Sequence, residues 1–354
     1  MQENFIASLE PELKNIRISV VIPALNEEKV IGRCLEALTH NDFPKNAFEV
    51  IMVDNGSRDR TVEIARSFDS LLKIRILGVS GVHISELRNR GAALATGRFL
   101  AFLDADCIAH SNWLTNANRL LEDAGPGIVG AHYQIPEDAT WVGRVWCEDR
   151  STEKVGDVSY VPSGDLLLRR EAFLQLGGFD ESIETNEDFE LCRRAATAGF
   201  TVRSYPDLRV VHLGTPRTLQ GFYKKQRWQG THVFTVFLRD PEKRRNRRPV
   251  ALSLYTVLCL ILLFGGSLWG LWTGRWLFAL LFLVVYIGPF LLISCVRTIP
   301  RGKWGETLAL TVLYLTFGLA RAESILRVRA WRGSSRKTAV RAMNSPGASS
   351  SGLE

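Results

Sequence analysis

The sequence predicts an α/β domain with a mostly parallel sheet, followed by C-terminal transmembrane helices. Three observations support this prediction. Short β-branched runs alternate with amphipathic helical stretches from Arg17 onward, polar residues gather where the predicted strands end, and two long apolar runs follow a change of composition at Asp240. Alternating strands and helices are typical of a parallel sheet whose two faces are covered by helices.

The first half of the chain alternates regularly between the two kinds of element. Its strands are continuous apolar runs, as expected of strands buried on both faces. The predicted strands are 18–22, 48–53, 73–77 and 98–104, and the predicted helices are 27–38, 59–68 and 84–95. Such sheets bind ligands at the carboxyl ends of their strands. Because PALNEE, DNGSRD and DAD each follow a strand, we expect the site at that edge.

The second half of the predicted domain, which as a whole covers 16–238, is less regular. Its predicted elements are a strand at 159–170, a helix at 187–199 and a short strand at 208–213. A helix stop at Gly199 agrees with the preference for glycine just after a helix end.

A membrane region is predicted at 251–332, between a basic linker at 239–250 and a disordered basic, serine-rich tail at 333–354. Its first two apolar runs, 251–272 and 276–296, each have about 21 residues without a charge, enough to cross a hydrocarbon core of about 30 Å. A third run at 307–320 has only 14 residues, a length that allows a tilted span, a re-entrant segment or a surface helix.

Charge is distributed unevenly along the chain. Residues 1–238 carry 27 basic and 32 acidic side chains, whereas residues 239–354 carry 17 basic and 5 acidic ones. The acidic half is unsuited to wrapping a polyanion, and the basic half is also the apolar half. This pairing points to anionic lipid and argues against a nucleic-acid partner.

The cysteine spacing argues against both a local zinc site and a disulfide framework. The six cysteines include no CxxC pair, so free thiols in a reducing compartment are the expected state. The first fifteen residues have no apolar core of signal-peptide length, which places the segment before the first span in the cytosol.

The charges also predict the membrane topology. The basic cluster at 243–248 precedes the first span, so the positive-inside rule leaves residues 1–248 in the cytosol. The short turn 273–275 is then external. Seven basic residues follow the third apolar run, and a full third span would place them all outside. We therefore expect 307–320 to be re-entrant or interfacial, with a cytosolic C-terminus.

Two strand ends carry candidate ligand-binding carboxylates. Asp104 and Asp106 follow an apolar strand at i and i+2, where they can share a divalent cation that bridges to a diphosphate. Asp54 ends another strand next to the turn residue Gly56, where an aspartate can accept hydrogen bonds from a base or ribose. Taken alone, each is equally compatible with an ordinary turn or a structural acidic pair.

Two further segments also allow two readings. Glu187 and Asp188 begin a predicted helix, so one of them is either a general base or a capping residue. Arg227 and Trp228 lie in a stretch rich in lysine and aromatic residues. The arginine can bind a phosphate, and the segment can equally be a basic amphipathic helix on lipid.

The order of the motifs resembles that of the family-2 glycosyltransferases. The matching segments are VIPALNEE, VDNGSRDRT, RNRGAALATGRFLAFLDAD, GGFDE and EDFELCRR. The resemblance covers roughly residues 16–235 and implies a Rossmann-like nucleotide-diphospho-sugar transferase domain of the type A class. It also implies an inverting, metal-dependent reaction.

The resemblance assigns five residues to the nucleotide. Pro23, Ala24 and Glu27 match the segment that lines the nucleotide pocket. Asp54 matches the aspartate that hydrogen-bonds the uracil, and Arg88 matches a position facing the nucleotide.

The resemblance also implies a site for Mg²⁺ or Mn²⁺ and a catalytic base. Asp104 matches the carboxylate that lies toward ribose and metal, and Asp106 matches the direct metal ligand. His212 sits where some members have a histidine near the diphosphate; a histidine with only a packing role is the alternative. Asp188 matches the catalytic base.

Departures from the family pattern also inform the prediction. Gly164 and Asp165 lie on the strand that contacts donor sugar and acceptor, with Asp165 in place of the usual asparagine. Processive synthases carry a QxxRW motif. This chain keeps its arginine and tryptophan, Arg227 and Trp228, as donor-site residues, but it has Lys224 at the glutamine position. Since the membrane region is also small, single-sugar addition is favoured over processive synthesis.

These features predict a multi-pass enzyme of a bacterial-type inner membrane with its catalytic domain in the cytosol. We expect it to move one sugar from a nucleotide sugar, UDP-linked on the family pattern, to a lipid-linked, glycolipid or envelope polysaccharide acceptor. A polyprenyl-phosphate sugar synthase is the first alternative, because it shares every motif. A catalytically inactive membrane assembly subunit is the second.

Overall fold

The computed structural model describes residues 16–123, 125, 127–150, 155–231, 237 and 247–324. The chain divides into two compact units, Met1–Thr218 and Leu219–Glu354, so the division comes before the predicted end of the first domain at residue 238. That end, most of the predicted basic linker and the predicted tail lie outside the described residues.

The first unit is built on a mixed sheet whose first four strands are parallel. The strand order is β3-β2-β1-β4-β8-β6-β9-β7, and β8 pairs antiparallel with both β4 and β6. The strands are β1 Ile18–Ala24, β2 Phe48–Asp54, β3 Ile74–Gly78, β4 Phe99–Leu103, β6 Ile128–Gly130, β7 Gly156–Asp157, β8 Asp165–Arg169 and β9 Val202–Ser204. The predicted α/β fold with a mostly parallel sheet is confirmed.

A second, two-stranded sheet lies beside the first. In it, β5 (Cys107–Ala109) pairs antiparallel with β10 (Val210–His212), and His212 is opposite Cys107. Because β5 begins directly after the DAD motif, this pairing brings His212 to the carboxyl end of β4 although about a hundred residues separate them in the chain.

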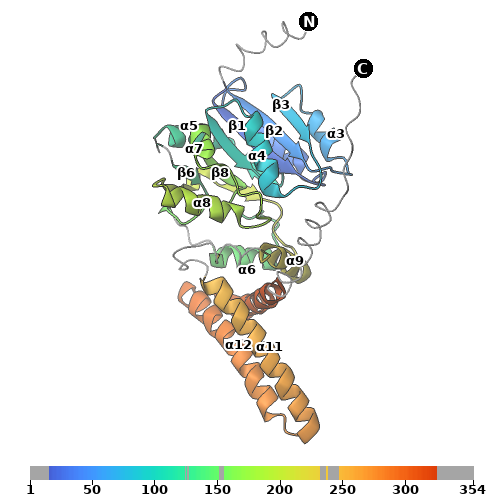
Figure 1. Cartoon of the computed structure of the whole chain (residues 1–354). Coiled ribbons are helices and arrows are strands. Elements are labelled where there is room, and N and C mark those ends of the chain that lie inside the picture. The colour runs from blue at the N-terminus through green and yellow to red at the C-terminus, as the bar shows by residue number, and fades with distance from the viewer. Residues whose placement is uncertain are drawn as a thin grey trace, which may run out of the picture. The chain divides into compact units, whose positions relative to one another are not determined.

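Helices cover both faces of the main sheet (Figure 1). Val20 and Ile22 of β1 belong to one apolar core, and Val21 belongs to the other, because successive strand side chains point to opposite faces. The helices are α2 Ile31–Thr39, α3 Thr61–Arg66, α4 Ile84–Leu94, α5 Trp113–Asp123, α6 Trp141–Arg150, α7 Arg170–Gln175 and α8 Glu187–Thr197. Residues of α2, α3 and α5 contribute to the first core, and residues of α4, α7 and α8 to the second.

The first predicted helix begins later than expected, and hydrogen bonding explains the difference. The prediction placed its start at Glu27, whereas α2 begins at Ile31. Asn26 has a left-handed backbone with φ of 56°, and the Glu27 amide donates to Thr61 Oγ1 (2.7 Å). The backbone after β1 is therefore held as a loop against the loop after β2.

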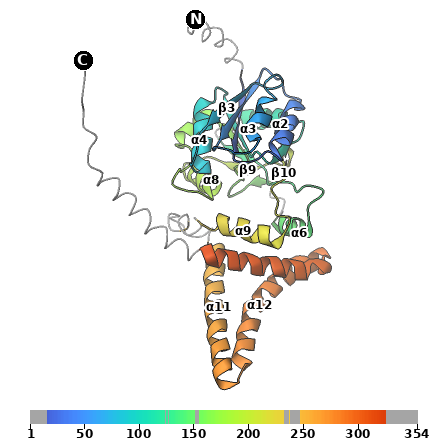
Figure 2. The same ribbon diagram turned by 90° about the vertical axis from the view of Figure 1, so that its right-hand side faces the viewer.

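The second unit contains α9 Leu219–Gln229, the long helices α11 Arg247–Thr273 and α12 Leu277–Thr298, and a helix over 307–324. The short 3-10 helices η2 Ile299–Arg301 and η3 Trp304–Glu306 connect α12 to the last helix. Within this unit, α11 and α12 form a hairpin, and the helix over 307–324 runs across the end of it (Figure 2).

The helix over 307–324 packs against both neighbours in its unit. Tyr314 and Leu315 lie against the hairpin core of Cys259, Tyr286 and Phe290. On the α9 side, Ser324 Oγ donates to the Arg227 carbonyl (2.7 Å) and the Arg227 guanidinium pairs with Glu323 (3.3 Å).

Among the described residues, two helical stretches have the length and composition needed to cross a membrane, Val250–Thr273 and Leu277–Arg301. They cover the two predicted spans except Trp276, which directly precedes the second stretch. Only 28% and 17% of their most apolar windows are buried within the structure, whereas the core helix of a soluble domain is mostly buried.

Candidate active site

The two carboxylates of the DAD motif have different surroundings at the end of β4. Asp104 has both oxygens engaged, since Arg88 Nη2 donates to Oδ1 (2.6 Å) and Tyr133 Oη donates to Oδ2 (3.3 Å). Asp106 Oδ2 lies 3.6 Å from Nε2 of His212. The backbone supports this second pair, because the Leu213 amide donates to the Asp106 carbonyl (2.8 Å).

The surroundings of Asp106 fit a divalent cation. Ligand atoms of Asp106, Cys107 and His212 lie within 4.8 Å of one another. Burial, followed by Asp104 and Asp106, raises the pKa of the Cys107 thiol well above its ordinary value, and sulfur suits Mg²⁺ or Mn²⁺ less well than carboxylate oxygen does. Asp106 and His212 are therefore the pair best suited to hold a metal, with Asp104 close by but already bonded.

Glu27 adds a third carboxyl group to this region. Burial, followed by the charges of Asp106 and Asp104, raises its pKa to about 7. Acidic groups that lie close enough to repel one another are typical of a site that binds a cation, because a bound positive charge relieves their repulsion. The predicted neighbours Pro23 and Ala24 lie on β1, in register with Val53 and Asp54 of β2.

Asp54 presents one fixed hydrogen-bond acceptor. Its Oδ2 accepts from the amides of Gly56 and Ser57, both at 3.0 Å, and Gly56 meets the turn with a φ of 80°. Its Oδ1 is buried and has no hydrogen-bond partner among the described residues. A buried acceptor without a partner is costly, so it is well placed to receive a donor from a ligand.

Arg88 is buried and ion-paired in the structure, and its predicted position facing the nucleotide stays a prediction. The side chain is 1% exposed, and its guanidinium bridges Asp104 (2.6 Å) and Glu187 (2.8 Å). A buried guanidinium requires carboxylate partners because desolvation of an unpaired charge is expensive. Arg88 thus ties the end of β4 to the start of α8.

Asp188 is the half-buried carboxylate at the start of α8. Its Oδ1 accepts from the Phe189 amide (2.7 Å), and its Oδ2 accepts weakly from the Ser163 amide (3.4 Å). Burial and the neighbouring Glu187 raise its pKa to about 7. The Glu187 carboxylate already pairs with Arg88 and accepts from Ser163 Oγ (2.9 Å). Asp188 is therefore the better proton acceptor of the two.

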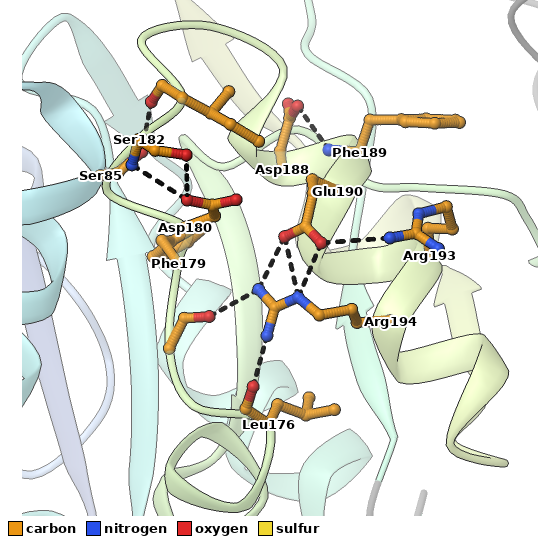
Figure 3. Close-up of polar contacts among 12 residues, drawn as sticks. Ser85, Leu176, Phe179, Asp180, Ser182, Asp188, Phe189, Glu190, Arg193 and Arg194 are labelled. Carbon is orange, nitrogen blue, oxygen red and sulfur yellow. Dashed lines mark hydrogen bonds and ion pairs between the residues drawn. The ribbon is translucent and has the colours of Figure 1, made fainter. Parts of the chain in front are cut away.

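Arg194 holds α8 against the loop that precedes the helix (Figure 3). Arg194 donates to Glu190 through Nε (2.8 Å) and to the carbonyls of Leu176 and Gly178, the latter at 2.7 Å. From the other side, Asn89 of α4 bonds both the amide and the carbonyl of Phe179 at 2.9 Å. The GGFDE loop is therefore clamped between α4 and α8, and this fixes where α8 begins.

Gly164 and Asp165 have separate roles. A side chain on Gly164 would come within 2.3 Å of Asp104 Oδ2, so this glycine does border the site. Asp165 is 0% exposed and accepts from Trp113 Nε1 and the Ala131 amide, both at 3.0 Å. Burial raises its pKa well above the ordinary value. Asp165 therefore lies in the core with both oxygens bonded, and its contact with the donor stays a prediction.

Arg227 and Trp228 lie on α9 in the second unit. There Arg227 pairs with Glu323, and Trp228 is 44% exposed. Their assignment to the nucleotide sugar stays a prediction.

The sequence reasoning missed Tyr133, Ser163 and Trp113, each of which contacts a predicted site residue. Tyr133 and Ser163 lie in irregular segments where no periodic pattern marks them. The one available signal was the position of Ser163 next to Gly164 in the PSGD segment.

Gly214 makes a specific prediction about the metal site. A Cβ there would lie 2.0 Å from Asp106 Oδ2 and 2.8 Å from His212 Cε1. We expect Gly214→Ala to displace both groups and reduce activity by about 100-fold, as loss of correct metal-site support does. The assay is turnover at saturating Mn²⁺. Gly78→Ala is the matched control, since nothing lies within 4 Å of a Cβ at Gly78; equal activity of the two variants would contradict this assignment.

The α/β domain has carboxylates at its strand ends, a pair of side chains that suits a cation, and a separate carboxylate of raised pKa. This combination points to a sugar-transferring enzyme. Residues 19–177 match the model of Glycosyl transferase family 2, and residues 99–320 match that of Glycosyl transferase family group 2. The chain belongs to glycosyltransferase family 2, and the resemblance noted in its motifs is confirmed.

Characterised relatives carry the same class of activity in their names. Glycosyltransferase AglE of Haloferax volcanii is 30% identical over 247 residues, which cover 68% of this chain and 80% of the relative. Amylovoran biosynthesis glycosyltransferase AmsB of Erwinia amylovora is 33% identical over 205 residues, which cover 53% and 66%. The match to probable glycosyltransferase YdaM of Bacillus subtilis spans 71% of this chain and 64% of that protein.

Among solved structures, the mannosyltransferase PcManGT from Pyrobaculum calidifontis is similar in fold. It aligns with a TM-score of 0.58 over 89% of this chain and 93% of that one, at 19% identity. That structure is a complex with GDP-Man and Mn²⁺. At this identity the likeness concerns the fold alone.

Proposed function

We propose that this glycosyltransferase moves a single sugar from a nucleotide sugar, UDP-linked in the first instance, to a lipid-linked or envelope polysaccharide acceptor at the cytosolic face of a membrane. The observation that carries the proposal is that one buried arginine connects the predicted cation site with the predicted catalytic base. Arg88 connects the carboxylates at the end of β4 to the helix start that carries Asp188.

Recognition of the base rests on Asp54. Its unpartnered Oδ1 is an acceptor held in one direction by the two amides on Oδ2. Such an acceptor matches the ring N–H of uracil, and equally that of guanine, whereas adenine and cytosine present an acceptor at that ring nitrogen. The site thus favours nucleotides with a ring N–H.

The transfer step follows from the position of Asp188. Asp106 and His212 would hold the cation, which when bound supplies charge neutralisation for the leaving diphosphate. Asp188 takes the proton from the acceptor hydroxyl as the hydroxyl oxygen forms its bond to the anomeric carbon. The bond between the anomeric carbon and the diphosphate oxygen breaks in the same displacement. The configuration therefore inverts without an enzyme nucleophile.

The proposed membrane anchor rests on α11 and α12. Large apolar side chains stay exposed along both helices, for example Phe264 at 67%, Trp272 at 81% and Leu277 at 74%. Apolar surface of this extent requires a cover, and a bilayer provides it. The lipid acceptor follows from this placement, since a membrane-held active site meets a lipid-linked substrate in two dimensions. A multi-pass location in a bacterial-type inner membrane is part of the same proposal.

Topology can be tested with a reporter that works only outside the cytosol. The helix over 307–324 packs across the hairpin end and carries Arg321 and Glu323 close to α9, which supports an interfacial helix more than a third span. We expect no external signal when the reporter follows Glu354 and a strong one when it is inserted at Gly274. A strong signal after Glu354 would instead mean three full spans.

The proposed activity is tested by incubating membranes containing the full chain with a panel of nucleotide sugars. We expect cation-dependent release of the nucleoside diphosphate from one of them, with a new glycolipid found by mass analysis. An acid-labile sugar phosphate as product would identify a polyprenyl-phosphate sugar synthase instead. No release from any donor would favour the inactive assembly subunit.

A further inference from the structure

Tyr133 contacts three of the predicted site residues at once, although no motif marks it. The chain after β6 runs alongside β10, where the Gln134 amide donates to the Val210 carbonyl (2.9 Å) and the His212 amide donates to the Gln134 carbonyl (3.0 Å). These two hydrogen bonds on neighbouring backbone fix the position of Tyr133 beside the metal-site strand pair.

The hydroxyl of Tyr133 controls the orientation of Asp104. It donates to Asp104 Oδ2 (3.3 Å) and accepts from the Gly164 amide (3.0 Å). Because Arg88 holds the other oxygen of Asp104, the carboxylate is fixed from two sides.

The ring of Tyr133 controls the orientation of His212. The two ring centroids are 4.5 Å apart with an interplanar angle of 38°, and the tyrosine ring packs against the first apolar core. A ring supported from behind limits rotation of the imidazole. This keeps Nε2 on the side of Asp106 Oδ2, at 3.6 Å.

We propose that Tyr133 is the positioning residue of the donor site: its hydroxyl sets Asp104 and its ring sets His212. The proposal rests on the proposed function, since it concerns the same cation and nucleotide site. The hydroxyl and the ring of Tyr133 act on different residues, Asp104 and His212. Two substitutions can therefore test the two roles separately.

The test compares Tyr133→Phe with Tyr133→Leu in the full chain purified in detergent. Mn²⁺ binding is measured by electron paramagnetic resonance, with and without UDP, and turnover is measured beside it. We expect Tyr133→Phe to keep the Mn²⁺ affinity within about threefold and to lose about tenfold in turnover, because it lacks only the hydroxyl. We expect Tyr133→Leu to lose about 10- to 100-fold in Mn²⁺ affinity, the usual effect of removing support from a metal ligand.

Tyr205→Phe is the matched control, because Tyr205 packs against the same core and loses the same hydroxyl. Equal Mn²⁺ affinity in the wild type and Tyr133→Leu overturns the role of the ring, and wild-type turnover in Tyr133→Phe overturns that of the hydroxyl. If Tyr133→Leu does not fold, Tyr133→Met replaces it as the test of the ring, and Tyr133→Phe still tests the hydroxyl. Mn²⁺ binding does not depend on sugar transfer, so failure of the proposed function would appear separately, as a wild type that binds Mn²⁺ but turns over no donor.

Discussion

Asp188→Asn is expected to lower sugar transfer by about 100- to 10,000-fold, the usual contribution of a general base. The substitution keeps the shape of the side chain and one acceptor for the Phe189 amide, which now lies 2.7 Å from Oδ1. It removes only the ability to take a proton. Donor binding should therefore change little, and the effect should appear in kcat and not in the KM for the nucleotide sugar.

The pH dependence provides the second half of this prediction. A base works in its deprotonated form, and the pKa of Asp188 is raised to about 7 by burial and by Glu187. Transfer by the wild type should therefore rise with pH through about 7 and level off above it. The pH series is run on donor and acceptor at saturation, so that binding does not contribute.

Asp157→Asn is the control for the same chemical change, since the Asp157 side chain is 79% exposed and pairs only with Arg203 among the described contacts. Near-normal turnover in Asp188→Asn would place the base elsewhere. Glu187 is then the next residue to test, although Arg88 and Ser163 already hold its carboxylate.

Asp106→Ala is expected to reduce transfer to the background rate. Stabilisation of charge by a metal ion is worth several kcal/mol, which corresponds to at least about 1,000-fold in rate. The fold should stay intact, because the Asp106 side chain is 21% exposed and, among the described residues, its ion-pair contact is the His212 ring at 3.6 Å. Activity is measured beside the melting temperature, and excess chelator should have the same effect on the wild type.

Asp207→Ala is a suitable control, since it removes a carboxylate that is 60% exposed and pairs with Arg119. Full wild-type activity in excess chelator would exclude the metal-dependent mechanism. Activity retained by Asp106→Ala but lost on chelation would move the cation to Asp104 and Glu27.

The parts of the site that follow from strand ends could be predicted from the sequence. Asp54 and the DAD motif directly follow apolar strands, and carboxyl ends of parallel strands meet at one edge. Asp188 was readable because EDFELCRR begins a helix. In each case the position depends on local pattern alone.

The contacts that the sequence could not predict join distant segments of the chain. Arg88 and its partner Glu187 are 99 residues apart, and Asp165 and Trp113 are 52 apart. Nothing in the local pattern of α4 says that Arg88 turns inward, because polar residues on a helix usually face solvent. The family resemblance places Asp165 among the donor-binding residues. In the structure, Trp113 and the Ala131 amide donate to its carboxylate in the core.

The anomeric configuration of the product tests the central claim most directly. A single displacement with Asp188 as base, and no enzyme nucleophile, requires that the new glycosidic bond has the configuration opposite to that of the donor. The measurement is the proton NMR coupling at the anomeric centre of the purified product, taken early enough to precede mutarotation of any free sugar. Inversion is the predicted result, and a product that retains the donor configuration would contradict the mechanism.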